Sequence, residues 1–462
     1  MKRNMWFVFL LSMLLLIALS GCLGSSSSSS DDDTDTNTDT ETNTDTETDS
    51  EDNEADVIRI ASAETGADTI EVLQNAGDKY EAEFGTKVEV EAVPLADIFT
   101  KINATYGTSA QYDAFLTGFI GHISILEEEG KLAPVDDIIE NLGGKEDFYD
   151  GQILFPIEEQ TYWIPYDYNL AYGYIRTDWL EEKGLSVPKT WDELVNVAKE
   201  FTNKEENKYG LILPLKSDGA TNWVTSSLLW ANEVRIFDDD WNVILDSEEM
   251  KPKVVESLNL LKELFPYMPS EAANASYSEL TETFISDQVG MTFYSGRLVD
   301  ILEEKNPELG ENFEVFGIPM QDGNGVAATL GYDSIGILES EHTDETKKFV
   351  EWFYKEELFS FLHTYGVHYF PAQESIYNSE EWRDDPVIQK YWESGVEPQY
   401  DLLKNAELHS IDSDGPTTDA RPGKVFEAFL IPKLFQKVTL NNEDPGEAVD
   451  DIADEIRSLV DN

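Results

Sequence analysis

The alternation of strand and helix patterns early in the chain constrains the fold most strongly. Residues 57–61 are rich in β-branched side chains and alternate in polarity, which predicts a strand. A helix with one apolar face is predicted from Asp68 to Gly85, because glycine is a common helix terminator. Residues 87–91 alternate again and predict a second strand, and residues 112–116 continue the pattern. Strand, helix and strand in this order predict an α/β fold.

The stretch from residue 151 to residue 201 changes character three times. Its aromatic run at residues 162–174 contains Asp167 and other polar groups, which a single buried strand would leave unpaired. We therefore expect two strand ends that flank a crossing between two parts of the fold. Farther on, Thr190 and Glu193 have the spacing of a helix capping box, and the apolar residues that follow share one helix face.

Within this stretch, YDYNLAYGYIRTDWLEEKGL and PKTWDEL resemble the central signature of extracellular solute-binding proteins of the maltodextrin-binding type (solute-binding protein family 1), the capture subunits of ABC importers. The segments FISDQVGMTFYSGR, FEVFGIPM, GYDSIGIL and GVHYFPAQ follow in the order of that family, so the resemblance spans residues 57–462. It implies a two-lobed periplasmic-binding-protein-like fold (type II) with three crossings, near residues 167–171, 314–318 and 367–371.

The resemblance also implies how the chain is divided between the lobes. Lobe 1 is expected to comprise residues 57–168 plus 318–368, and lobe 2 residues 169–317 plus 369–462. Chain length agrees with this division, because about 400 residues exceed what one hydrophobic core usually organises.

The N-terminus has the features of a targeting segment. Lys2 and Arg3 precede an apolar stretch that is short for a membrane span, and Leu-Ser-Gly before Cys22 resembles a lipobox. Cys22, the only cysteine, is therefore predicted to be lipidated at the extracellular face of the cell membrane; an uncleaved anchor helix is the alternative. Residues 1–22 are interpreted as a lipoprotein signal peptide and residues 23–56, acidic and rich in Ser and Thr, as a disordered tether.

The charge balance is strongly acidic. The chain has 93 Asp and Glu against 32 Lys and Arg, a net charge of −61. This argues against nucleic acid as a partner, because phosphate binding requires clustered basic residues. A halophilic setting explains the composition, since the screening length falls to about 3 Å in 1 M salt.

The sequence contains no convincing motif for catalysis, for a cofactor or for a metal. No G-x-S-x-G, H-E-x-x-H or G-x-x-x-x-G-K-[ST] occurs, so we predict no catalytic residue, no cofactor and no metal. Residues 323–328 imitate a dinucleotide fingerprint, but a hairpin turn is expected there. Residues 412–415 (DSDG) suggest calcium, but the twelfth loop position holds Arg421 rather than Glu, so a solvated turn is expected. The five histidines show no metal-ligand spacing.

Candidate ligand contacts come first from the sheet. In open α/β sheets, ligands bind at the carboxyl ends of strands. This points to Glu64 after the first strand, and to Thr117 and Phe119 after the strand pattern at 112–116. For Glu64, capping of the following helix is the alternative.

The resemblance supplies the other candidates. It places Asn169 at the first crossing, Trp223 as a stacking aromatic of the second lobe, and Tyr332 just beyond the second crossing; core packing is the alternative for the aromatic residues. Arg297 stands where relatives often have Trp, and Arg421 lies in the C-terminal cleft segment SDGPTTDARPG. Because guanidinium groups suit carboxylates, an acidic carbohydrate is one hypothesis for the ligand, with surface ion pairs as the alternative.

These observations predict a lipid-anchored, monomeric binding protein that captures a carbohydrate by hinge closure, without covalent chemistry, for an ABC permease. Two alternatives stay open: a binding protein for another small solute, and a secreted carbohydrate-active enzyme, because 93 carboxylates guarantee that some pair lies at glycosidase spacing. Two sequons, at Asn103 and Asn274, leave glycosylation open as well.

Overall fold

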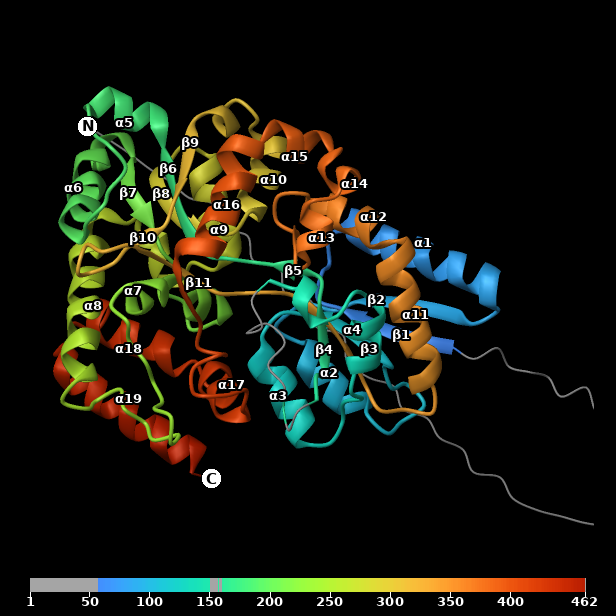
Figure 1. The fold of residues 1–462 in the computed structure, drawn as a ribbon. Coiled ribbons are helices and arrows are strands. Elements are labelled where there is room, and N and C mark those ends of the chain that lie inside the picture. Colours follow the sequence, from blue (N-terminus) through green and yellow to red (C-terminus); the bar gives the residue numbers. More distant parts are fainter. Residues whose placement is uncertain (1–56, 150–156, 158–159, 462) are drawn as a thin grey trace, which may run out of the picture. The chain divides into compact units, whose positions relative to one another are not determined.

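A computed structural model describes residues 57–149, 157 and 160–461. The predicted signal peptide with Cys22 and the predicted tether lie outside the described residues. The predicted α/β class is confirmed, because helices surround two larger sheets, one of five and one of four strands, which two small sheets accompany (Figure 1). Within the described part of the chain, no helix combines the length and the apolar character needed to cross a bilayer.

The first sheet contains the predicted strand, helix and strand unit. Its strand order is β2-β1-β3-β12-β4, with β1 parallel to β2 and β3, and β12 antiparallel to β3 and β4. The strands are β1 (Val57–Ser62), β2 (Lys87–Ala92), β3 (Ala114–Thr117), β12 (Ser334–Ile337) and β4 (Trp163–Pro165). Helix α1 (Ala67–Phe84) joins β1 to β2 and ends at Gly85, whose φ of 85° explains the glycine.

The second sheet has the order β7-β8-β6-β9, with β6 antiparallel to both β8 and β9. Its strands are β6 (Tyr172–Arg176), β7 (Tyr209–Ile212), β8 (Val289–Tyr294) and β9 (Phe313–Phe316). Helices α5 (Thr177–Lys183), α6 (Trp191–Phe201), α8 (Met250–Leu264), α9 (Tyr277–Ile285) and α10 (Arg297–Lys305) belong to the same part of the chain (Figure 1).

Helix α6 begins close to the predicted capping pattern. The Thr190 hydroxyl accepts a hydrogen bond from the Glu193 N–H at 3.2 Å. The Glu193 carboxylate accepts from the Lys189 N–H at 2.7 Å, one residue earlier than in a standard capping box. The predicted apolar face is confirmed, since its members are all buried: Leu194, Val197, Ala198 and Phe201.

Two of the predicted crossings lie side by side. The chain leaves the first sheet after β4 and enters the second at β6, and between them β5 (Asp167–Tyr168) pairs antiparallel with β13 (Phe370–Pro371). The first and third crossing segments therefore hydrogen-bond to each other.

The return to the first sheet differs from the expectation. Strand β9 is an integral part of the second sheet, and β10 (Ile318–Pro319) then forms the predicted hairpin with β11 (Val326–Thr329). Strand β11 pairs in turn with β14 (Glu407–His409). The chain therefore reaches the first sheet only at β12, after residue 329 rather than near residues 314–318. The lobe boundaries stay a prediction.

The remaining helices complete the fold. The helix predicted at residues 343–361 is two helices, α11 (Thr343–Glu356) and α12 (Leu358–Leu362), which are separated at Glu357. The other helices are α2 (Ile98–Thr105), α3 (Ile120–Glu128), α4 (Asp136–Asn141), α7 (Ser227–Trp230), α13 (Glu374–Tyr377), α14 (Glu380–Arg383), α15 (Pro386–Lys390), α16 (Glu397–Asn405), α17 (Ala420–Glu427), α18 (Leu430–Thr439) and α19 (Pro445–Val460). Helix α17 packs against α3, as well as against α18 and α19 (Figure 1).

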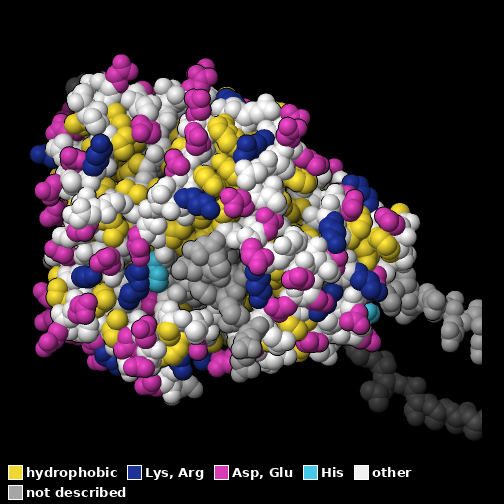
Figure 2. All heavy atoms as spheres, in the orientation of Figure 1, with side chains coloured by type: hydrophobic (Ala, Val, Ile, Leu, Met, Phe, Trp, Pro, Cys, Tyr) yellow, Lys and Arg dark blue, Asp and Glu magenta, His cyan; other side chains and the backbone are white. Residues whose placement is uncertain are grey.

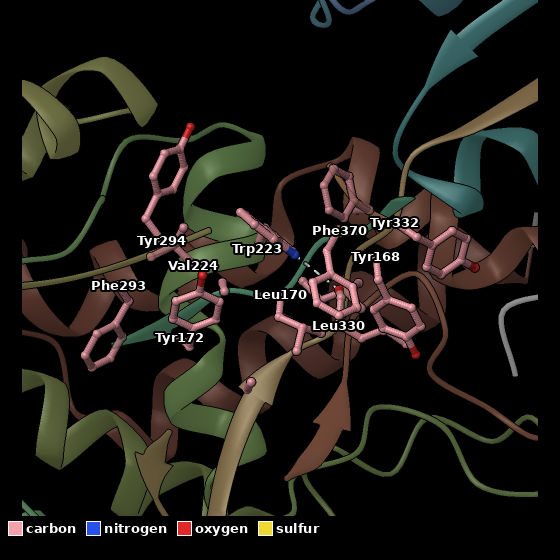
Figure 3. Packing of buried hydrophobic residues seen from close by; sticks show 14 of the residues in the cluster. Tyr168, Leu170, Tyr172, Trp223, Val224, Phe293, Tyr294, Leu330, Tyr332 and Phe370 are labelled. Carbon is pink, nitrogen blue, oxygen red and sulfur yellow. Dashed lines mark hydrogen bonds between the residues drawn. The ribbon is translucent and has the colours of Figure 1, made fainter. Parts of the chain in front are cut away.

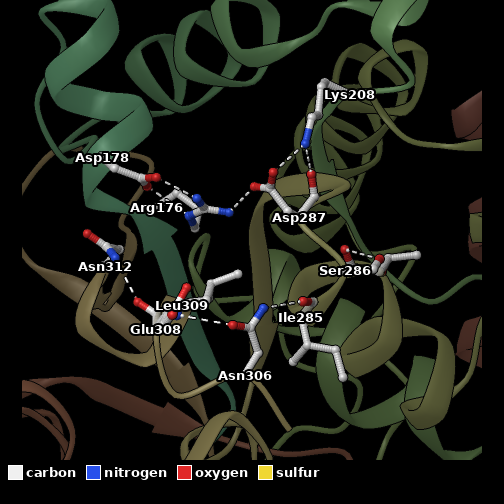
Figure 4. A network of polar contacts seen from close by, with 11 residues as sticks. Arg176, Asp178, Lys208, Ile285, Ser286, Asp287, Asn306, Glu308, Leu309 and Asn312 are labelled. Carbon is white, nitrogen blue, oxygen red and sulfur yellow. Dashed lines mark hydrogen bonds and ion pairs between the residues drawn. The ribbon is translucent and has the colours of Figure 1, made fainter.

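A buried arginine stabilises one end of the second sheet. Arg176, at the end of β6, forms ion pairs with Asp178 and Asp287, and Lys208 also donates to Asp287 at 2.6 Å (Figure 4). Burial works to raise the pKa of Asp287, but the hydrogen bonds from Lys208 and Arg176 lower it below its ordinary value. The network thereby ties β6 to the segments before β7 and β8.

The acidic composition is visible on the surface. Figure 2 shows Asp and Glu side chains spread over the visible face, with fewer Lys and Arg between them. Many of these basic residues lie beside a carboxylate, as Lys437 does with Glu443 at 2.7 Å and Asp451 at 3.1 Å.

Candidate ligand-binding site

A cavity of about 280 Å³ lies among the loops that follow β1, β3 and β8 and the crossing segments. Its volume is near the lower end of the range of about 300–1,000 Å³ that is usual for small-molecule sites. Six of the eight predicted contact residues line it: Glu64, Phe119, Asn169, Trp223, Arg297 and Tyr332. The fold thus brings together side chains that are up to 268 positions apart, from Glu64 to Tyr332.

Glu64 and Arg297 form an ion pair in this cavity. The Arg297 Nη2 lies 2.7 Å from Glu64 Oε2, and the Tyr369 hydroxyl donates to the same oxygen at 2.6 Å. The guanidinium also lies over the Tyr365 ring, 4.6 Å from its centroid. Burial works to lower the pKa of Arg297, but Glu64 and the neighbouring tyrosines outweigh it and hold the pKa well above its ordinary value. Arg297 is therefore charged and already neutralised by a protein carboxylate.

A second carboxyl group, Asp333, lies at the crossing. It is 8% exposed and accepts a hydrogen bond from Asn169 Nδ2 at 3.3 Å, while its backbone N–H donates to Asp167 Oδ1 at 2.7 Å. Burial and the nearby Glu64 raise the pKa of Asp333 to about 7. Burial and Asp333 itself raise the pKa of Asp167, which is fully buried. An ionised Asp333 therefore opposes the ionisation of Asp167.

The segment at residues 412–415 corrects the expectation of a solvated turn. Asp414 is fully buried, because its carboxylate accepts from the Ile236 N–H at 2.9 Å and the Phe237 N–H at 3.1 Å. Asp412 lines the cavity, and its Oδ1 is buried without a hydrogen-bond partner in the described part of the chain. Burial raises the pKa of Asp412 to about 8.

Aromatic side chains form the apolar wall. Trp223, in a π-helical turn at Thr221–Thr225, donates its indole N–H to the Leu330 carbonyl at 3.1 Å (Figure 3). It meets Tyr277 and Tyr294 at 6.4 and 6.3 Å between ring centroids, both in edge contacts. Gly331 allows this arrangement, because a Cβ there would lie 2.8 Å from Trp223 Nε1. Flat apolar walls beside a few polar groups suit a ring-shaped, hydroxylated solute.

Three groups in the cavity have the arrangement of possible metal ligands. Glu64, Asp333 and His368 each offer one ligand atom, and these atoms lie within 4.8 Å of one another. Burial, with Arg297 nearby, holds the pKa of His368 well below its ordinary value, so the imidazole is neutral. The guanidinium paired with Glu64 opposes a cation at the same place.

Two predicted residues do not line this cavity. Thr117 is buried one position before Gly118, which does line it, and the Thr117 hydroxyl has no partner among the described residues. Arg421 forms an ion pair with Asp419 at 3.2 Å and packs over the Trp241 ring at 4.9 Å.

Sequence reasoning missed Asp333, His368, Asp412, Tyr277 and Tyr294 as lining residues. Three of them lie beside or within segments that the sequence analysis had already singled out. Asp333 follows the predicted Tyr332, His368 lies in the predicted third crossing, and Asp412 begins the calcium-like motif.

A second cavity of about 780 Å³ adjoins the first and shares Leu95, Phe119 and Tyr277 with it. Phe426 of α17 and His122 of α3 also line it. The Phe119 and Phe426 rings are 4.5 Å apart between centroids. The two cavities together offer space beyond that of a single small ring.

Comparison with curated proteins reveals distant relatives. The chain is 22% identical over 319 residues to YcjN of Escherichia coli, provisionally named an ABC transporter periplasmic-binding protein; the match covers 67% of this chain and 70% of YcjN. It is 25% identical over 214 residues to the multiple sugar-binding protein of Streptococcus mutans; this match covers 43% of this chain and 48% of that protein.

Solved structures share the fold. A solute-binding protein of Thermotoga lettingae, bound to alpha-D-tagatose, superposes with a TM-score of 0.71 at 18% identity, covering 88% of this chain and 99% of that one. Maltose-bound MalE3 of Thermotoga maritima gives a TM-score of 0.70 at 18% identity, covering 88% and 100%. These likenesses confirm the predicted two-lobed, periplasmic-binding-protein-like fold. Residues 75–390, more than half of the chain, match the family described as bacterial extracellular solute-binding protein, and the chain belongs to this family.

Proposed function

We propose that this protein captures a carbohydrate outside the cell and delivers it to the permease of an ABC transporter. The observation that carries the proposal is the first cavity, in which Trp223, Tyr277 and Tyr294 form apolar walls beside the polar groups of Asn169 and Asp333. Aromatic faces stack on the apolar faces of sugar rings, and amide and carboxyl groups bind the hydroxyls at the ring edge. Relatives with sugar-binding names support the same class of ligand.

The adjoining cavities favour an oligosaccharide. The first cavity, at about 280 Å³, is small, and the second continues past Leu95 and Tyr277 with about 780 Å³. A chain of sugar units could place one unit in the first cavity and further units beside Phe119 and Phe426.

Hinge closure is the proposed mechanism. The first cavity is lined both by Glu64, which follows a strand of the first sheet, and by Arg297, which follows a strand of the second. A ligand that contacts both sides stabilises this arrangement over more open ones, and the paired crossings β5 and β13 would flex. The ligand is released unaltered.

The proposal includes attachment to the membrane. Lipidation of Cys22 would anchor the chain, and residues 23–56 would serve as a tether, which is consistent with the extracellular family. We further propose that the protein acts as a monomer.

The test is a thermal-shift and calorimetric screen of neutral, amine-bearing and acidic saccharides, with chromatography of the recovered ligand. For the best ligand, Trp223→Ala should weaken binding at least about 10-fold through loss of the stacking surface. Trp352→Ala, on α11 of the first lobe, is the matched control, since Trp352 does not line either cavity. Cleaved saccharide, or equal affinity of both variants, would refute the proposal.

A further inference from the structure

We propose that the first cavity selects a carbohydrate that carries a positively charged amino group and disfavours one that carries a carboxylate. This inference rests on the proposed function, because it specifies the chemical class of the ligand at the same site.

The charges that line the cavity are unbalanced. Three carboxyl groups line it, those of Glu64, Asp333 and Asp412, and Arg297 is the one Lys or Arg among its described lining residues. Glu64 already pairs with Arg297 at 2.7 Å. Asp333 and Asp412 form no ion pair with any described residue, and Asp167 lies directly behind Asp333.

This imbalance opposes an acidic ligand. A ligand carboxylate would be repelled by Asp333 and Asp412 whenever these are ionised, and like charges repel far more strongly in surroundings of low dielectric constant than in water. Arg297, the one basic residue among the described lining residues, already pairs with Glu64 and does not balance a further carboxylate. The hypothesis of an acidic ligand depended on Arg297 and Arg421. Arg297 is neutralised by Glu64, and Arg421 lies over Trp241 beside Asp419, outside the cavity.

The same cavity offers what an ammonium group needs. An ammonium has three hydrogen-bond donors and no acceptor. Asp412 Oδ1 and the hydroxyl of Tyr332, which is 7% exposed, are buried without hydrogen-bond partners among the described residues. Trp223, Tyr277 and Tyr294 also line the cavity, and aromatic rings attract a cation that lies over a ring face within about 6 Å.

A metal ion is the competing occupant. Glu64, Asp333 and His368 could supply three ligands, but Arg297 already occupies one carboxylate oxygen of Glu64. The lining acceptors that have no partner among the described residues, Asn169 Oδ1, Asp412 Oδ1 and the Tyr332 hydroxyl, are not part of that group of three. An ammonium on the ligand uses these acceptors as well, so the geometry favours it.

The experiment titrates the full chain with saccharides that differ in one substituent. Cellotriose is neutral, the chitosan trimer replaces each 2-hydroxyl by an ammonium, and the β-1,4-linked glucuronate trimer replaces each 6-hydroxymethyl by a carboxylate. Glucose, glucosamine and glucuronate form a second, smaller series. In calorimetry, we expect the amine to bind at least about 10-fold more tightly than its neutral counterpart and the carboxylate to bind more weakly than both.

Two Asp→Asn variants locate the effect. Asp412→Asn should reduce the preference for the amine over the neutral saccharide about 10-fold, and its unfolding temperature without ligand shows that the variant is folded. Asp239→Asn, on an exposed turn away from both cavities, should leave the preference unchanged.

The results that would overturn the inference are as follows. Equal or tighter binding of a neutral or acidic member, or an unchanged preference in Asp412→Asn, would overturn it and leave carbohydrate binding intact. Absence of binding across both series would overturn this inference; the proposed function is overturned only if the wider saccharide screen also finds no ligand. Stabilisation by zinc or calcium chloride alone, lost in His368→Gln, would assign the cavity to a metal ion instead.

Discussion

The contact between α3 and α17 gives the sharpest test of closure. The two helices meet at Gly121 and Gly423: a Cβ added to Gly423 would lie 2.3 Å from the Gly121 carbonyl oxygen, and a Cβ added to Gly121 would lie 2.4 Å from the Gly423 Cα. Both obstacles are backbone atoms, which cannot rotate away. Gly423→Ala must therefore move the helices apart.

This separation should act on the closed arrangement specifically. Helix α3 follows β3 of the first sheet, whereas α17 packs with α18 and α19, which pack on α8 beside the second sheet. His122 Nε2 lies 3.0 Å from Glu427 Oε1 across the same contact. Overpacking costs about 1–3 kcal/mol, which corresponds to a loss of ligand affinity of about 5- to 150-fold if it falls on this arrangement alone.

The assay combines calorimetry with small-angle scattering. Gly423→Ala should bind the best saccharide more weakly and show a larger radius of gyration at saturation than the native chain, with little change in unfolding temperature without ligand. Gly446→Ala is the matched control, since a Cβ there meets only side-chain atoms, the nearest at 3.2 Å. If Gly423→Ala keeps native affinity and compaction, α3 and α17 do not have to meet for the ligand to bind.

The remaining predictions concern charge. Because burial raises the pKa of Asp412 from 3.8 to about 8, its protonated form stabilises the fold below pH 3.8 and this contribution is lost as the pH rises through 8. In urea unfolding, the free energy of unfolding of Asp412→Asn relative to that of the native chain should therefore rise by up to about 4 kcal/mol between pH 5 and pH 9. A difference that does not change with pH would contradict the burial argument. Arg297→Gln leaves the partly buried Glu64 without its ion-pair partner and should cost up to about 3 kcal/mol, most of it recovered in the double variant with Glu64→Gln; additive losses would argue against a coupled pair. With a net charge of −61, the unfolding temperature should rise as sodium chloride increases from 0.1 to 2 M beyond the rise given by equal osmolality of sucrose.

Secondary structure could be predicted from the sequence where the beginning or end of an element is determined by residues close to it in the chain. Gly85 ends α1 because it takes a left-handed conformation, and Thr190 begins α6 because its hydroxyl accepts an orphan N–H. The return crossing was misplaced because the apolar run of β9 reads equally well as a crossing or as a strand, and only its pairing with β6 decides.

The site could be predicted where strand ends or the family resemblance marked it, as for Glu64 and Trp223. Asp333 and Asp412 could not, because their burial depends on contacts over long separations in sequence. Asp333 meets Asp167 across 166 positions, and the turn that carries Asp412 is held down by the bonds of Asp414 to residues 236 and 237. In both cases, a polar loop pattern that usually indicates solvent instead marks a buried acceptor.

The two arginine candidates show why charge must be interpreted together with its partners in this chain. Because the chain has 93 acidic and 32 basic residues, a Lys or Arg can usually pair with a carboxylate of the protein itself. Arg297 pairs with Glu64, and Arg421 pairs with Asp419. A basic residue here therefore says little about the charge of a ligand. The informative groups are those without a hydrogen-bond partner among the described residues. In the cavity these are three acceptors: Asn169 Oδ1, the Tyr332 hydroxyl and Asp412 Oδ1. Because an unpaired buried acceptor costs free energy until a donor arrives, the ligand should contribute donors at that end of the cavity.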